Sequence, residues 1–138
     1  MLAYTMQDEP DRFVSKHWMG VPLPNDQYLV TIAGVALITM PAAKSNDWNR
    51  EQVALKLSFK AALPEGKLLR IEQWVPYVSI SAHKTSDGGV AVDEFGAQIS
   101  AGPADDVTIT AKVAARPKGA DIMRLGYHLS LRGTLSAT

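Results

Sequence analysis

Apolar and polar side chains alternate along several short stretches of the chain. The alternation is clearest in Val53–Ala61, Val107–Val113 and Leu125–Leu131. Successive side chains of a strand point to opposite faces, so a period of two predicts strands with one face in the core and the other in water. The residues between these stretches, such as Pro64-Glu65-Gly66 and Pro117–Gly119, are typical of turns.

Two further stretches depart from simple alternation. Tyr28–Thr39 is apolar and β-branched at almost every position, which predicts a strand covered on both faces. After Leu69 and Ile71 the apolar positions change phase beyond Gln73, close to Pro76. A phase change beside a proline predicts a bulge in an edge strand.

The remaining elements are short. Asp87-Gly88-Gly89 predicts a turn, followed by one strand at Val90–Phe95 and another at Ala97–Ser100. Asn46–Gln52 is the one stretch with a helical pattern, of one or two turns, because Asn46 or Asp47 can cap it.

These patterns add up to about seven strands and predict an all-β fold, a two-sheet antiparallel β-sandwich over residues 28–138. Immunoglobulin-like and jelly-roll sandwiches both arise from such spacing, so both alternatives stay open.

Residues 1–27 form a separate segment, which we expect to be an extended N-terminal arm. Pro10, Pro22 and Pro24 interrupt it and no period persists. It nevertheless carries large apolar side chains that gain nothing from exposure to water. We therefore expect the arm to pack on a neighbouring subunit or back on its own domain. The expected partner-binding residues are Phe13, Trp18, Met19 and Leu23.

Composition and charge narrow the function classes. The 138 residues include 14 Lys and Arg, 14 Asp and Glu, and no cysteine. Zero net charge argues against a nucleic-acid or anionic-membrane partner, and the lack of cysteine excludes disulfides and thiolate metal sites. No apolar run is long enough for a membrane helix and the start does not resemble a signal peptide, so we expect a protein of the virion or the cytoplasm.

We find no signature of catalysis, metal binding or a cofactor. The three histidines, His17, His83 and His128, lack zinc-ligand spacing. The acidic pairs Asp93-Glu94 and Asp105-Asp106 match no calcium loop, and no Gly-x-Ser-x-Gly or phosphate-binding glycine motif occurs. We therefore expect no enzyme, no metal and no cofactor.

Basic residues recur at alternate positions of two predicted strands. They are Lys56 and Lys60 in one strand, and Arg124 and Arg132 on either side of His128 in the other. They would build a basic wall if both strands lay in one sheet, and an ordinary solvated face otherwise.

Trp48 stands in the polar sequence Asn46–Arg50. An aromatic ring flanked by amides and carboxylates suits sugar binding, although Trp48 could equally close one end of the sandwich. The ligand-binding alternative uses Asp47, Trp48, Asn49 and Tyr77.

Taken together, these patterns favour a structural or interaction subunit of an ordered assembly. Our best interpretation is a phage capsid, decoration or tail component whose arm binds neighbouring subunits in a homo-oligomer or virion. The alternative is a carbohydrate- or small-ligand-binding β-sandwich module.

Overall fold

The computed structural model describes residues 3–7, 13–40, 49–82, 90–115 and 121–137. Within these ranges the chain forms eight strands and one short 3-10 helix. They are β1 (Ala3–Gln7), β2 (Phe13–Pro22), β3 (Gln27–Met40), β4 (Asn49–Ser58), η1 (Lys60–Ala62), β5 (Lys67–Ala82), β6 (Val90–Gln98), β7 (Asp106–Ala115) and β8 (Asp121–Ala137).

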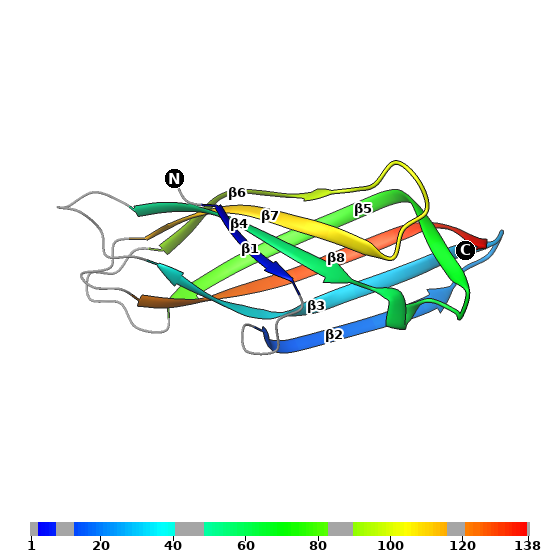
Figure 1. Cartoon of the computed structure of the whole chain (residues 1–138), viewed down its shortest axis with the longest axis horizontal. Helices are drawn as coiled ribbons and strands as arrows, with labels where there is room; N and C mark the ends of the chain where they lie inside the picture. Colours follow the sequence, from blue (N-terminus) through cyan, green and yellow to red (C-terminus); the bar gives the residue numbers. More distant parts are fainter. Residues whose placement is uncertain (1–2, 8–12, 41–48, 83–89, 116–120, 138) are drawn as a thin grey trace.

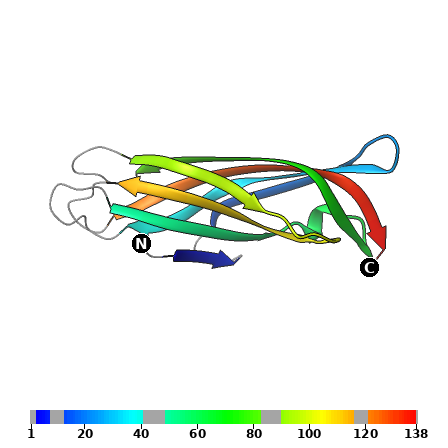
Figure 2. The same cartoon turned by 90° about the horizontal axis from the view of Figure 1, so that it is seen from above.

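The strands form two four-stranded sheets that pack face to face (Figures 1 and 2). Sheet A has the order β1-β4-β7-β6, and sheet B has the order β2-β3-β8-β5. All neighbours are antiparallel except β1 and β4, which are parallel. The predicted two-sheet β-sandwich is confirmed. Its strands include two, β1 and β2, from the segment that we separated as an arm.

The order of the strands distinguishes the two kinds of sandwich that the sequence left open. β3 pairs with β8 and β4 pairs with β7, as in one long hairpin that has been folded over into two sheets. In the immunoglobulin order the last two strands pair with each other, whereas β7 and β8 here lie in different sheets. The pairing is therefore that of a jelly roll.

The core lies between the sheets and includes the alternating residues predicted from the sequence, except Ala61, which is exposed because the chain leaves β4 after Ser58 and forms η1. Val53, Leu55, Leu57 and Phe59 are buried in or just after β4. The corresponding residues of the other two alternating stretches are also buried: Val107, Ile109, Ala111 and Val113 in β7, and Leu125, Tyr127, Leu129 and Leu131 in β8. Their polar neighbours in sequence face outward, because adjacent positions of a strand point to opposite faces.

The predicted bulge is confirmed. β5 is an edge strand, and its register with β8 shifts between Ile71 and Gln73.

Two smaller predictions are wrong. Val90–Gln98 is one strand and not two, because Gly96, at the predicted break, keeps its pairing with Thr110 on β7. Asn49–Gln52 belongs to β4 and not to a helical turn, because β7 supplies it with a full antiparallel partner. Residues 46–48 of that stretch, and the predicted turns at 87–89 and 117–119, lie outside the described residues.

The hairpin between β2 and β3 is fixed by two contacts. Asn25 and Asp26 both have φ of 62°, the left-handed conformation that type I′ hairpin turns require. Near the base of the hairpin, the Tyr28 hydroxyl donates a buried 2.8 Å hydrogen bond to the carbonyl oxygen of Ala62 in η1. This bond holds η1 against the inner side of β2 at Gly20, where a Cβ would overlap the same carbonyl.

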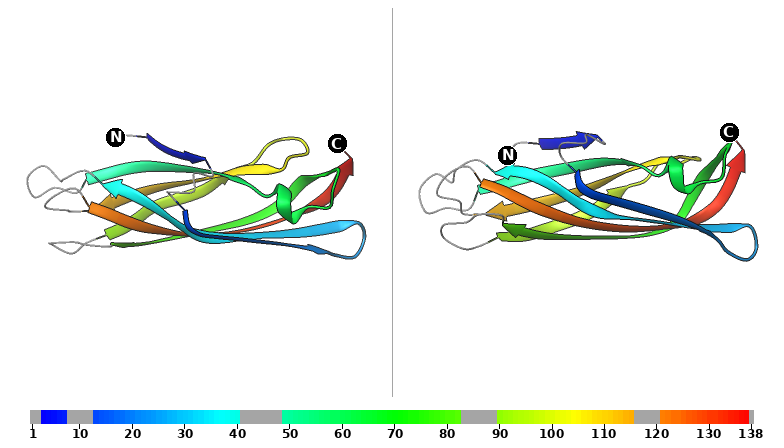
Figure 3. Two further views of the ribbon diagram at one scale, coloured as in Figure 1. Left: turned by 60° about the horizontal axis from the view of Figure 1, so that its bottom comes forward. Right: turned by 90° about the horizontal axis from the view of Figure 1, so that it is seen from below.

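The tip of this hairpin reaches beyond the rest of the sandwich at the end where the C-terminus lies (Figure 3).

Candidate functional site

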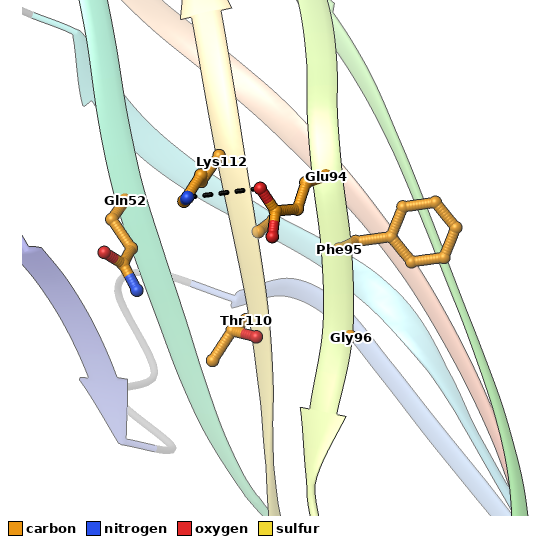
Figure 4. Close-up of a pocket in the computed structure, with 7 residues that line it drawn as sticks. Gln52, Glu94, Phe95, Gly96, Thr110 and Lys112 are labelled. Atoms are coloured by element: carbon orange, nitrogen blue, oxygen red, sulfur yellow. Dashed lines mark ion pairs between the residues drawn. The ribbon is translucent and has the colours of Figure 1, made fainter.

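The outer face of sheet A is polar, and its charges are paired. Three cross-strand rows make up its described centre: Gln52–Lys112–Glu94, Ala54–Thr110–Gly96 and Lys56–Thr108–Gln98. Lys112 and Glu94 form an ion pair at 3.1 Å (Figure 4), and two longer pairs, Lys56–Asp106 and Arg50–Asp93, lie on the same sheet. A face of this kind is stable in water as it stands.

A small hollow of about 140 Å³ lies on this face between Gln52, Glu94, Thr110 and Lys112. Phe95 also lines it, but its ring points away from the ion pair (Figure 4). The hollow is too small for a typical ligand pocket, and the charges of Lys112 and Glu94 neutralise each other. We therefore find no basis for catalysis or ligand binding there.

A larger, open hollow of about 750 Å³ lies beside the β2–β3 hairpin. Asp26 and Lys67 line it with opposite charges, and both are exposed. Leu23, one of the predicted partner-binding residues, is also part of its wall. Because the polar groups that line it are largely solvated, the hollow does not offer the converging polar contacts that specify a small ligand.

The outer face of sheet B, called the B face below, has a different character. Neighbouring strands place its residues in four cross-strand rows. The rows, each read from β2 to β5, are Val21–Leu29–Arg132–Gln73, Met19–Thr31–Ser130–Val75, His17–Ala33–His128–Tyr77 and Ser15–Val35–Gly126–Ser79.

Several large apolar side chains of the B face are exposed to water. Met19 is 59% exposed, Val75 67% and Tyr77 60%. Within the described residues, more than half of each of these side chains is left open to water. The outward residues of β3, from Leu29 to Leu37, are half-buried and lie between these exposed edges, so the prediction that Tyr28–Thr39 is covered on both faces stays a prediction for its outer face.

The four rows of the B face contain an arginine and no carboxylate. Arg132 lies in the first row, and Arg124 on β8 extends the face at the other end. None of the sixteen residues in the four rows is an Asp or a Glu. The nearest described carboxylate on sheet B is Glu72, which lies beyond the Arg132 row and accepts a 3.4 Å hydrogen bond from Thr134. The predicted basic wall does not form, since β4 and β8 lie in different sheets and Lys60 lies in η1.

Two tryptophans mark the opposite edges of sheet B. Trp18 on β2 is 43% exposed and Trp74 on β5 is 44% exposed. Both pair with residues of the core, Ile32 and Leu131, so both rings lie on the inner side of the sheet at its border. The ammonium group of Lys16 lies 5.4 Å from the centre of the Trp18 ring, within reach of a cation–π contact.

The four predicted partner-binding residues lie along β2 and just after it. Trp18 and Met19 lie on β2, and Leu23 follows that strand. Phe13 begins β2, but its side chain lies outside what the structure describes.

The ligand-binding set is divided. Asp47 and Trp48 lie outside the described residues, and Asn49 begins β4 in sheet A. Tyr77 is on β5 of sheet B, with its ring 6.0 Å from that of Phe95 in an edge-to-face contact. Asn49 and Tyr77 thus lie in different sheets.

Sequence reasoning missed the B face because it treated residues 1–27 as an arm without a period. A usable signal was present: Asn25-Asp26 is a two-residue turn of the kind that joins hairpin strands. The turn alone does not fix the register, because a plain two-residue loop would set Met19 opposite the buried Ile32, whereas the observed pairing sets Met19 opposite Thr31 and Val21 opposite Leu29.

Other kinds of site receive no support. Within the described ranges, no group of three or more histidine or acidic side chains is placed to hold a metal ion. Over the same ranges, no helix has the length and apolar character needed to cross a membrane. No protein-family model, curated protein or solved structure matches the chain.

Proposed function

We propose that this protein is a structural subunit of an ordered assembly built from copies of itself, of the kind that forms phage capsids, decorations or tails. One observation carries the proposal, namely the difference between the two outer faces of the sandwich. In this role the protein acts through contacts with its neighbours and not through catalysis.

The difference is chemical and not only one of degree. Sheet A presents paired charges and small polar side chains to water. The B face presents Met19, Val75 and Tyr77, all more than half exposed. Met19 lies on edge strand β2, and Val75 and Tyr77 lie on the opposite edge strand β5. Large apolar side chains exposed at both borders of one face suit a surface that another protein covers.

The sequence of β3 supports the same interpretation. A strand that is apolar on both faces is typical of a sheet covered on both sides. The core covers only the inner side of β3, and a neighbouring subunit would complete the burial of Leu29, Val35 and Leu37 on the outer side.

The charges of the B face favour contact with a different surface of the neighbouring copy. The four rows of the B face contain Arg132 and no carboxylate, so a surface that carries carboxylates is a better electrostatic partner for them than a second B face is. The chain exposes carboxylates elsewhere, at Asp26, Glu65 and Glu94. A contact between unlike surfaces repeats from copy to copy and produces a ring or a helical array.

Sedimentation velocity and negative-stain electron microscopy of the full chain test the proposal. We expect species larger than a dimer, with a regular shape, at concentrations up to about 100 µM, the range in which weak subunit contacts are populated. Val75→Glu should abolish these species because it places a charge at the most exposed of the three large apolar side chains of the B face. The matched control is Gln98→Glu, which adds the same charge to the outer face of sheet A and should leave assembly unchanged. Failure of the wild-type chain to exceed a dimer would contradict the proposal.

A further inference from the structure

The four sheet edges differ in how well they are protected against pairing with another strand. β5 carries Pro76, which lacks an N–H, and a bulge at Ile71/Gln73. β6 carries a bulge at Val92/Glu94 and lies beside β5, where Phe95 contacts Tyr77. Prolines and bulges are the usual protection of an edge strand.

The other two edges lack these features over most of their length. β1 has only five residues. β2 has ten and keeps an unbroken register with β3 from Ser15 to Pro22. Before Pro22 it contains no proline and no carboxylate, and Lys16 is its one charged residue at neutral pH.

No described strand pairs with the outer side of β2, which forms the border of sheet B (Figure 3). η1 contacts β2 on its inner face at Gly20, a contact that leaves the edge itself open. Apolar groups lie along this edge, with Trp18 43%, Met19 59% and Val21 36% exposed.

We propose that β2 pairs with β2 of a second copy about a twofold axis at Trp18, which joins the two B sheets into one antiparallel eight-stranded sheet. This inference rests on the proposed function and names one interface of that assembly. In this register Trp18 faces its symmetry mate, His17 faces Met19 of the second copy, and Lys16 faces Gly20.

The pattern of residues selects this register among the neighbouring ones. Side chains that face each other in a sheet must lie on the same side, so the axis must pass through a residue and not between two residues. An axis at His17 would place the two imidazoles opposite each other and extend the pairing into the bulge between Phe13 and Ser15. An axis at Met19 would extend the pairing to Pro22, which has no N–H to donate.

The axis at Trp18 pairs Ser15 through Val21 without either defect. Every basic side chain then lies opposite an uncharged residue, which avoids the repulsion between like charges on facing positions. It also stacks two half-exposed tryptophans, and buried tryptophans carry much of the binding energy of protein interfaces. The register at Trp18 is therefore the one that the residues of this edge favour.

The test compares two matched substitutions in the full chain by sedimentation equilibrium. Trp18→Lys places two ammonium groups opposite each other at the axis and should raise the dimer dissociation constant at least about tenfold. Trp74→Lys is the control, because Trp74 is equally exposed on the other edge of the same sheet. It should leave the dimer unchanged.

Mixing two variants separates a lost contact from a damaged fold. Trp18→Glu should also be monomeric alone, but an equimolar mixture with Trp18→Lys should form a heterodimer, because opposite charges then meet at the axis. Thermal unfolding of each variant shows whether it is folded. A wild-type chain that never dimerises, or a dimer that Trp18→Lys leaves intact, would overturn the inference.

The result is distinguishable from failure of the proposed function. If species larger than a dimer form, are lost in Val75→Glu and persist in Trp18→Lys, the edge pairing is wrong and the assembly proposal stands. If the chain stops at a dimer that depends on Trp18, the edge pairing stands and the assembly proposal is wrong.

Discussion

Replacement of Gly20 by alanine tests how closely η1 packs against sheet B. Gly20 faces inward on β2, opposite the buried Val30. A Cβ there would overlap the carbonyl oxygen of Ala62 and the Tyr28 hydroxyl, and would lie 2.8 Å from Cε1 of Tyr28. The hydroxyl and the carbonyl are partners in one buried hydrogen bond, so the added methyl group must break that bond or displace η1.

The magnitude follows from three terms. Loss of the bond leaves buried polar groups without partners, which costs about 1–3 kcal/mol. Overpacking costs a further amount of about 1–3 kcal/mol. The lower backbone entropy of alanine in the unfolded chain returns about 0.4–1 kcal/mol. We therefore expect Gly20→Ala to lower the free energy of unfolding by about 3 kcal/mol, within a range of about 1–5 kcal/mol.

Urea denaturation at low protein concentration measures this loss without a contribution from self-association. The control is Gly96→Ala in the edge strand β6, where the added Cβ would meet only Thr110 Oγ1 at 3.9 Å. It should change stability by less than about 0.5 kcal/mol. Tyr28→Phe removes the hydroxyl that Gly20→Ala would strike, so the double variant should lose less than the sum of the single variants. An unfolding free energy of Gly20→Ala equal to that of the wild type would refute the close packing of η1 on β2.

Three further substitutions test other parts of the fold, each by the same urea measurement. Phe59→Ala removes a fully buried ring and should cost about 3–5 kcal/mol; a loss below 1 kcal/mol would mean that the ring is not part of the core. Glu94→Gln breaks the ion pair between Glu94, whose side chain is 67% exposed, and Lys112, whose side chain is 43% exposed. It should change stability by less than about 1 kcal/mol because water screens the pair. Asp26→Gly relieves a left-handed aspartate and creates Asn-Gly at the hairpin turn, which should raise stability by up to about 1 kcal/mol; a loss of stability would argue against the turn.

The sequence predicts the later strands of the fold better than it predicts β2 near the N-terminus. The strands β4, β7 and β8 follow from the alternation of residues such as Leu55, Ile109 and Leu129, because burial of one face imposes a period of two on the sequence. Even the bulge in β5 follows from the change of phase at Gln73. β2 could not be found in this way, since its apolar side chains lie on both faces of an edge strand.

The candidate site could be predicted only in part. Trp18 and Met19 were selected because large apolar groups gain nothing from exposure to water, and both lie partly exposed on β2. The B face itself also needs β3, β8 and β5, and it exists only because the order of strands places Val75 beside Ser130 and Met19 beside Thr31. Strand order depends on pairing between distant segments, which the local pattern of a single chain does not encode.

The most direct test of the account is the mass of the full chain as a function of concentration, measured by sedimentation for the wild type, Trp18→Lys and Val75→Glu. The account predicts that the wild type forms a regular assembly with an even number of chains. Trp18→Lys should lose the dimeric unit from which that assembly is built. Val75→Glu should form dimers and no larger species. A wild-type chain that remains a folded monomer throughout would contradict both the assembly and the edge pairing.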